Sequence, residues 1–340
     1  MSVVIDLDRG RKEWAKPSIE ALTELTQTDI QKVNQTIIDH MESPVILIPQ
    51  VAGHIIGAGG KRLRPMLTLA AARMCGYDGD RHIGLAACVE FIHTATLLHD
   101  DVVDDSDLRR GSASANAVWG NKSSVLVGDF LFSRAFELMV KDGDLDVLRI
   151  LSEASSVIAE GEVLQLVTAN DTETTEGDYL KVIRSKTAKL FAAACEIGPV
   201  VAGRSREEWK ALNSFGHNIG MAFQLVDDVL DYSARQATLG KTVGDDFRDG
   251  KITLPVVLAF KGADNEEKCF WRRTMEDLEQ KKGDFRRAVT LLENSGALSS
   301  TINQAHEFGM RANQDLDAFP DSEFKTALLE AVDFAIRRNY

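Results

Sequence analysis

The 340-residue sequence predicts a single all-α domain, and three observations favour that fold class. Apolar residues recur at helical spacing along almost the whole chain, whereas the alternation typical of strands is scarce. The chain has only 7 prolines and is rich in alanine and leucine, a composition that suits helices. No composition break or Ser/Pro-rich linker divides it. We therefore expect residues 1–20 to be an N-terminal extension and residues 21–340 to form one domain.

The helices are predicted in order from the spacing of their apolar residues. The first covers residues 28–41, with Thr28 or Asp29 near its N-cap. The second, residues 64–76, is apolar nearly all round, so we expect it to be buried and to end at Gly76. The series continues over residues 84–105, 124–140, 146–169, 179–198 and 215–233. Loops are expected at residues 57–65, 107–116, 169–178 and 235–251.

Composition excludes several classes of function. The 52 acidic and 39 basic residues give a net charge of −13, which disfavours a nucleic-acid partner. The four cysteines show no CxxC spacing, so neither a zinc site nor a disulfide framework is indicated. The first residues lack the apolar core of a signal peptide, and no apolar run approaches the ~20 residues that span a bilayer. We expect a cytoplasmic protein with at most peripheral membrane contact.

Two acidic motifs of the form DDxxD stand at the ends of apolar stretches. The first contains Asp100, Asp101 and Asp104, and the second contains Asp227, Asp228 and Asp231. Positions i, i+1 and i+4 share one side of a helix, so each motif presents its carboxylates together. Clustered carboxylates raise one another's pKa, and divalent cations with oxygen ligands, such as Mg²⁺ or Mn²⁺, relieve that repulsion. One such motif alone is more often a solvated helix face, but a pair indicates a metal site that also binds phosphate.

Basic residues flank the two acidic motifs in short, loop-like segments. "GGKRLRP" places Lys61, Arg62 and Arg64 behind two glycines, a pattern that suits close approach to phosphate oxygens. Arg109 and Arg110 follow the first motif. The second motif is flanked by Lys186, Thr187, Lys241 and Lys251. The balance of acids and bases predicts two anionic groups, one bound through metal and one bound directly by cations.

These motifs, taken together and in this order, resemble those of the trans-isoprenyl diphosphate synthases. The carrying segments are "GGKRLRP", "EFIHTATLLHDDVVDDSDLRRG", "GEVLQL", "SKTAKLF", "MAFQLVDDVLDY" and "GKTVGDDFRDGKITLP". The similarity covers about residues 20–340 and is strongest to the long-chain branch, which makes octaprenyl to decaprenyl diphosphates. It implies an antiparallel helical bundle around a deep central cavity, a homodimer, and two or three Mg²⁺ ions per site, with Mn²⁺ as a possible substitute.

The resemblance also implies a role for each matching residue. Magnesium would be coordinated by Asp100, Asp104, Asp227 and Asp231, with Asp101 and Asp228 in support and Asp245 holding a metal-bound water. Isopentenyl diphosphate would contact Lys61, Arg64, His93 and Arg110. The allylic diphosphate would contact Arg109, Lys186, Thr187, Gln224, Lys241 and Lys251. Gln165 would line the cavity. The implied reaction ionises the allylic diphosphate, adds isopentenyl diphosphate to the allylic cation and then loses a proton.

Chain length is predicted from the residues that precede the first motif. Ala95 and Thr96 stand five and four positions before Asp100, about 6–7.5 Å further along the helix. Bulky residues there would close the pocket for the growing chain, whereas small residues leave it open. Small residues also permit tight helix packing, which is the simpler reading of these two positions by themselves. Within the resemblance, Ala95 and Thr96 predict a long product of about 40–50 carbons, used for a quinone side chain.

Other functions of the same fold remain open at this stage. A shorter-chain synthase would share these motifs, and a non-catalytic partner subunit of a heteromeric synthase typically loses aspartates that this chain retains. A class I terpene cyclase also carries DDxxD but has a different second metal motif and needs no "GGKRLRP" segment. The chain departs from the usual family pattern mainly at Asp249, where relatives usually have Glu.

Overall fold

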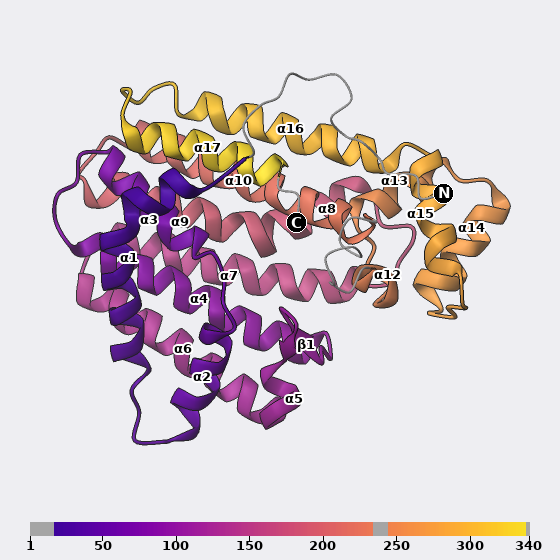
Figure 1. The fold of residues 1–340 in the computed structure, drawn as a ribbon, viewed down its shortest axis with the longest axis horizontal. Coiled ribbons are helices and arrows are strands. Elements are labelled where there is room, and N and C mark those ends of the chain that lie inside the picture. The colour runs from indigo at the N-terminus through magenta and orange to yellow at the C-terminus, as the bar shows by residue number, and fades with distance from the viewer. Residues whose placement is uncertain (1–16, 234–243, 338–340) are drawn as a thin grey trace.

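The computed structural model describes residues 17–233 and 244–337, which are almost entirely helical (Figure 1). The N-terminal helices are α1 (Glu20–Met41), α2 (Leu47–Gly57), α3 (Leu63–Met74), α4 (Arg81–Val103), α5 (Ala115–Trp119), α6 (Asn121–Asp142) and α7 (Leu145–Thr168). They are followed by α8 (Glu176–Ile183), the π-helical turn η1 (Arg184–Ala188), α9 (Lys189–Val201) and α10 (Arg206–Asp231). The C-terminal elements are α12 (Asp245–Arg248), α13 (Leu254–Gly262), α14 (Asn265–Trp271), the π-helical turn η2 (Arg272–Glu276), α15 (Asp284–Asn294), α16 (Ala297–Asp315) and α17 (Glu323–Arg337). The predicted all-α class is therefore confirmed.

Helix α4 lies at the centre of the N-terminal part of the bundle. It packs against α1, α3, α6 and α9, and most of its side chains are buried along the stretch from His82 to Leu98. Such a helix must be apolar on nearly every side, as its sequence is. Its C-terminal turn then leaves the core and carries the first acidic motif.

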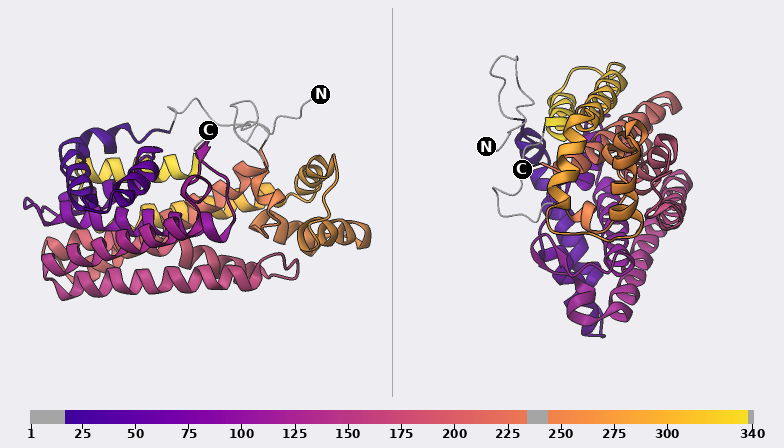
Figure 2. Two further views of the ribbon diagram at one scale, coloured as in Figure 1. Left: turned by 90° about the horizontal axis from the view of Figure 1, so that it is seen from below. Right: turned by 90° about the vertical axis from the view of Figure 1, so that its right-hand side faces the viewer.

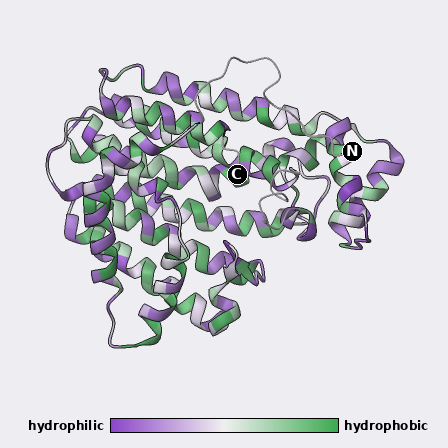
Figure 3. Cartoon of the chain, in the orientation of Figure 1, coloured by the Kyte–Doolittle hydropathy of each residue, from purple (hydrophilic) through white to green (hydrophobic). Residues whose placement is uncertain are grey.

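Helix α10 occupies the corresponding position in the other half of the bundle. It packs against α9, α16 and α17, and it also contacts η1 and α13. Seen from two further directions, the long helices lie side by side, and α14 and α15 extend from one end (Figure 2). Apolar and polar residues alternate around most helices, as expected where one face of each helix is buried (Figure 3). The second acidic motif ends α10 in the way that the first ends α4.

Close approach of α9 and α10 depends on glycine at position 216. A Cβ built on Gly216 would lie 2.8 Å from the Cα of Ala192, so the two backbones could not keep their separation. We expect Gly216→Ala to lower the free energy of unfolding by about 1–3 kcal/mol because it overpacks this contact. Gly84→Ala is the matched control, since a Cβ there meets no atom within 4 Å, and it should raise stability by up to about 1 kcal/mol. Urea unfolding of both variants would test this, and equal stabilities would contradict it.

The first predicted helix begins eight residues earlier than the sequence indicated. Helix α1 starts at Glu20, and Thr28 and Asp29 lie inside it rather than near its N-cap. Asp29 accepts hydrogen bonds from Arg73 at 2.7 Å and from His82 at 3.0 Å, so tertiary partners bind the carboxylate that resembled a cap. The predicted end of the second helix is close to the observed one, because α3 ends at Met74 and Gly76 follows with φ 80°.

Two segments contain structure that the sequence did not predict. The expected loop 107–116 contains an antiparallel hairpin of β1 (Leu108–Arg109) and β2 (Ser112–Ala113). The expected helix 179–198 is interrupted by the π-helical turn η1, an irregularity that is frequent at functional sites. A search of the described helices found none with the length and apolarity needed to cross a membrane.

Candidate active site

The first acidic motif projects from the C-terminal end of α4. Asp100 lies in the last turn and Asp104 caps the helix. Burial raises the pKa of Asp100, and the neighbouring charge of Asp104 raises it further. Lys186 opposes this shift, with its Nζ 3.5 Å from Oδ2 of Asp100. The motif therefore concentrates negative charge that one lysine only partly balances.

Asp101 points away from this charge and holds the hairpin. It is fully buried, and its Oδ1 accepts a hydrogen bond from Nε of Arg109 at 2.6 Å and forms an ion pair with Nη2 of the same residue at 2.5 Å. Asn116 donates to the Asp101 carbonyl at 3.1 Å. The structure thus engages Arg109, predicted to bind the allylic diphosphate, with Asp101. This arrangement suits the supporting role predicted for Asp101.

The second acidic motif ends α10 and is linked to two predicted substrate ligands. Asp228 is buried and accepts hydrogen bonds from Tyr179 and, at 2.9 Å, from Nε2 of Gln224. Burial raises its pKa to about 7. Thr187 donates to Oε1 of Gln224 at 2.9 Å. Thr187, Gln224 and Asp228 therefore form one hydrogen-bonded chain, to which Tyr179 adds a contact that sequence reasoning missed.

Asp231 connects α10 to the loop that follows. Its carboxylate accepts backbone N–H groups from Asp245 at 3.2 Å and Asp246 at 3.0 Å. Burial also raises the pKa of Asp231. Asp227, by contrast, is exposed on the same helix. Asp231 therefore fixes the start of α12 beside the motif, and Asp245 is exposed there, as a residue contacting metal-bound water would have to be.

Lys251 brings the two motifs together. Its Nζ lies 3.8 Å from Asp104 of the first motif, and 3.7 Å from both Asp246 and Asp249 in the loop anchored to the second. Asp246 and Asp249 were not predicted site residues, although both stand in the quoted "DDFRDGK". Asp249 stands where relatives usually have glutamate, and its side chain, shorter than that of glutamate, still contacts Lys251. Lys241 lies outside the described residues.

The π-helical turn η1 positions Lys186 and Thr187 opposite α7. A Cβ at Gly161 would lie 2.7 Å from the Ser185 Cβ and 3.0 Å from the Lys186 nitrogen, so only glycine allows this approach. The next residue, Glu162, accepts a hydrogen bond from Lys186 Nζ at 2.7 Å. Burial and Asp100 raise the pKa of Glu162 to about 7. Glu162 was missed, although "GEVLQL" contains it; Gln165, chosen there instead, is half-buried on α7 and its cavity role stays a prediction.

A basic cluster forms a second site, at the start of α3. Arg64 Nη1 lies 3.2 Å from His93 Nε2 on α4. Arg110, in the hairpin turn, lies against Gly60, where a Cβ would be only 2.6 Å from its Nη1. Burial and the nearby arginines hold the pKa of His93 well below its usual value. The structure thus brings Arg64, His93 and Arg110 together, as the sequence predicted, and Lys61 lies in the loop just before α3.

Glu90 partly balances this basic cluster, because it forms an ion pair with Arg62. Burial lowers the pKa of the Arg110 guanidinium, and the neighbouring charges of Arg109 and Arg62 lower it further. An electropositive cluster with few carboxylates is suited to a phosphate anion that arrives without metal.

The acidic site fits a divalent cation that is shared with a ligand. Its donors are carboxylate oxygens, the ligands that Mg²⁺ prefers. Burial, and to a smaller extent neighbouring carboxylates, raise the pKa of Asp100 and Asp231, and a bound cation would favour their charged forms. In residues 17–233 and 244–337, no three acidic, histidine or cysteine side chains converge closely enough to surround an ion. Asp100, Asp104, Asp227 and Asp231 are the residues that would hold such a metal, together with phosphate oxygens of a bound substrate.

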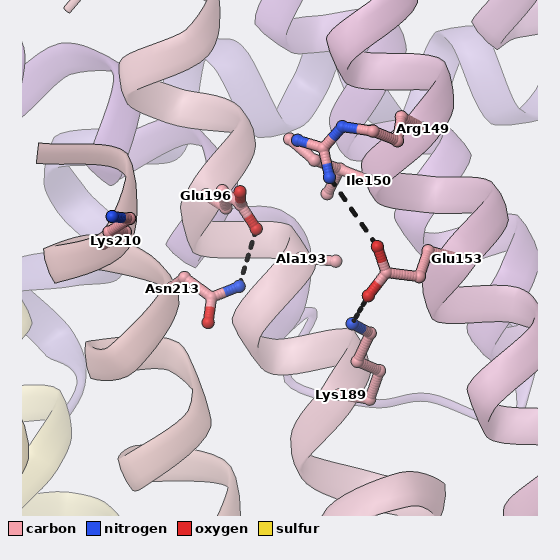
Figure 4. A pocket seen from close by; sticks show the side chains of 8 residues that line it. All are labelled: Arg149, Ile150, Glu153, Lys189, Ala193, Glu196, Lys210 and Asn213. Carbon is pink, nitrogen blue, oxygen red and sulfur yellow. Dashed lines mark hydrogen bonds and ion pairs between the residues drawn. The ribbon is translucent and has the colours of Figure 1, made fainter. Parts of the chain in front are cut away.

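A separate cavity of about 280 Å³ lies between α7, α9 and α10 and contains none of the predicted site residues. Figure 4 shows Glu153 between Arg149 and Lys189, and Asn213 donating to Glu196. Its charged groups largely satisfy one another, which indicates a solvated cleft rather than the substrate site.

The two chain-length residues lie on different sides of α4. Thr96 is three positions after His93 and four before Asp100, so it shares the site-facing side of the helix. Ala95 is fully buried and shares a side with His99, which contacts Asp129 of α6 at 3.4 Å. Their predicted effect on product length remains a prediction.

Comparison with known proteins agrees with these arrangements. The polyprenyl synthetase family matches residues 46–292. The chain is 45% identical over 326 residues to the octaprenyl diphosphate synthase of Escherichia coli K12, covering 95% of this chain and 99% of that protein. A polyprenyl synthase from Caulobacter crescentus CB15, crystallised with calcium and isoprenyl diphosphate, is 51% identical with a TM-score of 0.92, covering 96% and 99% of the two chains. A decaprenyl diphosphate synthase from Rhodobacter capsulatus is 48% identical with a TM-score of 0.91, covering 95% and 100%.

The matched region includes both acidic motifs, the basic cluster, and the loop whose Lys251 lies between the two acidic motifs. The similar proteins named above cover nearly the whole chain, and two of them are long-chain synthases by name. The chain therefore belongs to the polyprenyl synthetase family, in its long-chain branch of trans-prenyltransferases.

Proposed function

We propose that this protein extends an allylic diphosphate with isopentenyl diphosphate units, in a magnesium-dependent reaction, to an all-trans product of about 40–50 carbons. The observation that carries this proposal is the pairing of two different anion sites. One is an acidic site with lysines, suited to a metal-bound diphosphate. The other is a basic cluster built on Arg64, His93 and Arg110, suited to a diphosphate without metal. A condensation of two diphosphates needs both.

At the acidic site, the residues of this chain bind and orient the allylic diphosphate. Lys186 and Lys251 lie beside Asp100 and Asp104 and supply positive charge next to the carboxylates. Thr187 and Gln224 add neutral hydrogen-bonding groups. Bound Mg²⁺ would neutralise the charge that develops on the departing diphosphate. This arrangement favours cleavage of the allylic C1–O bond over attack by a protein nucleophile, and none is required.

At the basic cluster, isopentenyl diphosphate is held so that its double bond attacks the allylic C1. The new carbon–carbon bond leaves a tertiary cation, and loss of a proton to the departed diphosphate restores a double bond. Each cycle adds five carbons. The apolar residues of α4 and α10 behind the two motifs exclude water from the cations.

A product assay tests this proposal. The purified protein is incubated with Mg²⁺, labelled isopentenyl diphosphate and farnesyl diphosphate, and the dephosphorylated products are separated by length. We expect products of 40–50 carbons and none after chelation with EDTA. Products of 15–20 carbons would support a short-chain synthase instead. No incorporation would favour a non-catalytic partner subunit, and consumption of the allylic substrate alone would favour a cyclase.

We also propose that the protein is a homodimer that uses the outer face of α6. Val125, Leu126, Phe136 and Val140 are exposed there, with Leu126 at 67% and Val140 at 69%. Val125, Leu126, Phe136 and Val140 fall within about 100° of one another around the helix axis, so all four lie on one face of α6. Such an apolar stripe suits a self-complementary contact with a second copy.

The dimer proposal predicts a change in mass for Leu126→Asp. A buried, unpaired carboxylate in the contact should shift the protein to a monomer. Light scattering coupled to size-exclusion chromatography measures this. Met310→Asp, which changes an exposed apolar residue of α16, should leave the dimer intact. A dimer in both variants would contradict the use of α6.

We propose that residues 21–340 act as one domain and that the product supplies a quinone side chain. The four cysteines are unpaired, and three of them are buried, which suits work in the reducing cytoplasm.

A further inference from the structure

Arg64 is held in an unusual way for a half-buried arginine. Burial lowers the pKa of its guanidinium to about 10, so it remains charged at neutral pH. No ion pair between Arg64 and a carboxylate is found among the described residues, and its buried Nε has no hydrogen-bond partner there. Its Nη1 lies 3.2 Å from His93, whose low pKa keeps that ring neutral. The charge of Glu90 favours the Arg64 cation from a distance, but Glu90 forms its ion pair with Arg62, so a different group must contact the Arg64 guanidinium directly.

That direct contact is made by an aromatic ring. The Cζ of Arg64 lies 4.2 Å from the ring centroid of Phe191 on α9. A cation over an aromatic face is attracted by the ring quadrupole, and the attraction strengthens where water is excluded. Lys61, in the loop just before α3, lies 4.2 Å from the ring centroid of Phe334 on α17, so a second cation of this segment also contacts an aromatic ring.

The Phe191 ring is itself fixed from the other side. It is 1% exposed, and its centroid lies 5.7 Å from that of Phe223 on α10. A Cβ at Gly220 would lie 3.1 Å from the Phe191 Cβ, so α10 closes tightly over the base of this side chain. The ring cannot move without disturbing the contact between α9 and α10.

We propose that Phe191 is a positioning residue for isopentenyl diphosphate binding, because it holds Arg64 in place without neutralising it. A ring contacts the face of a guanidinium and leaves its in-plane N–H groups for oxygen acceptors. A carboxylate would occupy those donors and repel a diphosphate. Arg62 and Arg109 illustrate the alternative, since they are engaged by Glu90 and Asp101. This inference rests on the proposed role of Arg64.

The test replaces Phe191 in the full-length protein by phenylalanines that carry one, three or five fluorines. Fluorination weakens and finally reverses the ring quadrupole while changing shape little. We expect the KM for isopentenyl diphosphate to rise stepwise, to about tenfold for the pentafluoro variant. The KM for farnesyl diphosphate should stay within about twofold, because the ring contacts of Phe191 are with Arg64 of the basic cluster and with Phe223. The same series at Phe215, a buried ring of α10, is the matched control.

Arg64→Met separates this inference from the function on which it depends. A raised KM for isopentenyl diphosphate in Arg64→Met, with a stepwise rise in the fluorinated series, supports both. A raised KM with a flat series overturns the role of Phe191 and leaves the proposed function standing. An unchanged KM in Arg64→Met overturns the assignment of Arg64, and with it this inference. The singly fluorinated protein, closest in shape to the native one, keeps the test valid if the pentafluoro variant does not fold.

Discussion

Asp100→Asn should lower kcat by about 10³-fold or more, equivalent to at least about 4 kcal/mol of transition-state stabilisation. The asparagine keeps the size of the side chain but removes the charge that a metal requires. Asp100 has two roles in the proposed site. It would coordinate the metal as part of the first acidic motif, and it forms an ion pair with Lys186, whose Nζ lies 3.5 Å from Asp100 Oδ2. Losing it weakens cation binding and also leaves the lysine with Glu162 alone.

The measurement is kcat at saturating Mg²⁺ and saturating concentrations of both substrates. Asp107→Asn is the matched control, because Asp107 is exposed in the loop just after the motif. It should retain activity within about twofold. If Asp100→Asn unfolds like the native protein, its lower kcat comes from the lost carboxylate and not from a loss of folded structure. Activity within tenfold of the native protein would contradict a metal role for the first motif.

The acidic motifs were predictable because they stand where an apolar helix meets a charged segment. That boundary is local in the sequence, and α4 and α10 end close to where it predicted. The basic cluster was predictable for a related reason: glycines 59 and 60 precede it, and the structure uses Gly60 to admit Arg110. Both the acidic motifs and the basic cluster were therefore predictable from the residues next to them in the sequence.

What the sequence missed depends on contacts between distant elements. Glu162 reaches Lys186 only because Gly161 lets α7 approach the π-helical turn, and Tyr179 reaches Asp228 from a different helix. The residue type of Asp29 suits an N-cap, yet this residue lies inside α1, where Arg73 and His82 bind its carboxylate. Periodicity along one segment contains no information about partners 24 to 53 residues away.

Ala95→Phe should shorten the product, and the structure adds a distinction between Ala95 and its neighbour. Thr96 shares the side of α4 that carries His93 and Asp100, so Thr96→Phe would place a ring directly below the acidic site. Ala95 faces α6 and is fully buried, so a ring there must displace α6 side chains or enter the pocket. Overpacking at Ala95 should cost about 1–3 kcal/mol of stability, which thermal unfolding would record.

The sharpest form of this experiment is a series of increasing size, Ala95→Val, Ala95→Leu and Ala95→Phe, beside Thr96→Val and Thr96→Phe. If the helix lines the path of the growing chain, product length should fall as side-chain volume rises. Thr96→Val, which adds no bulk, should leave product length unchanged. Shortening at Thr96 alone would place the chain against the site-facing side of α4, and shortening at both positions would place it between α4 and α6. An unchanged product length in every active variant would refute the prediction that small residues on α4 leave room for the growing chain. Ala95 and Thr96 would then serve only the packing of α4, and the end of the growing chain would lie elsewhere.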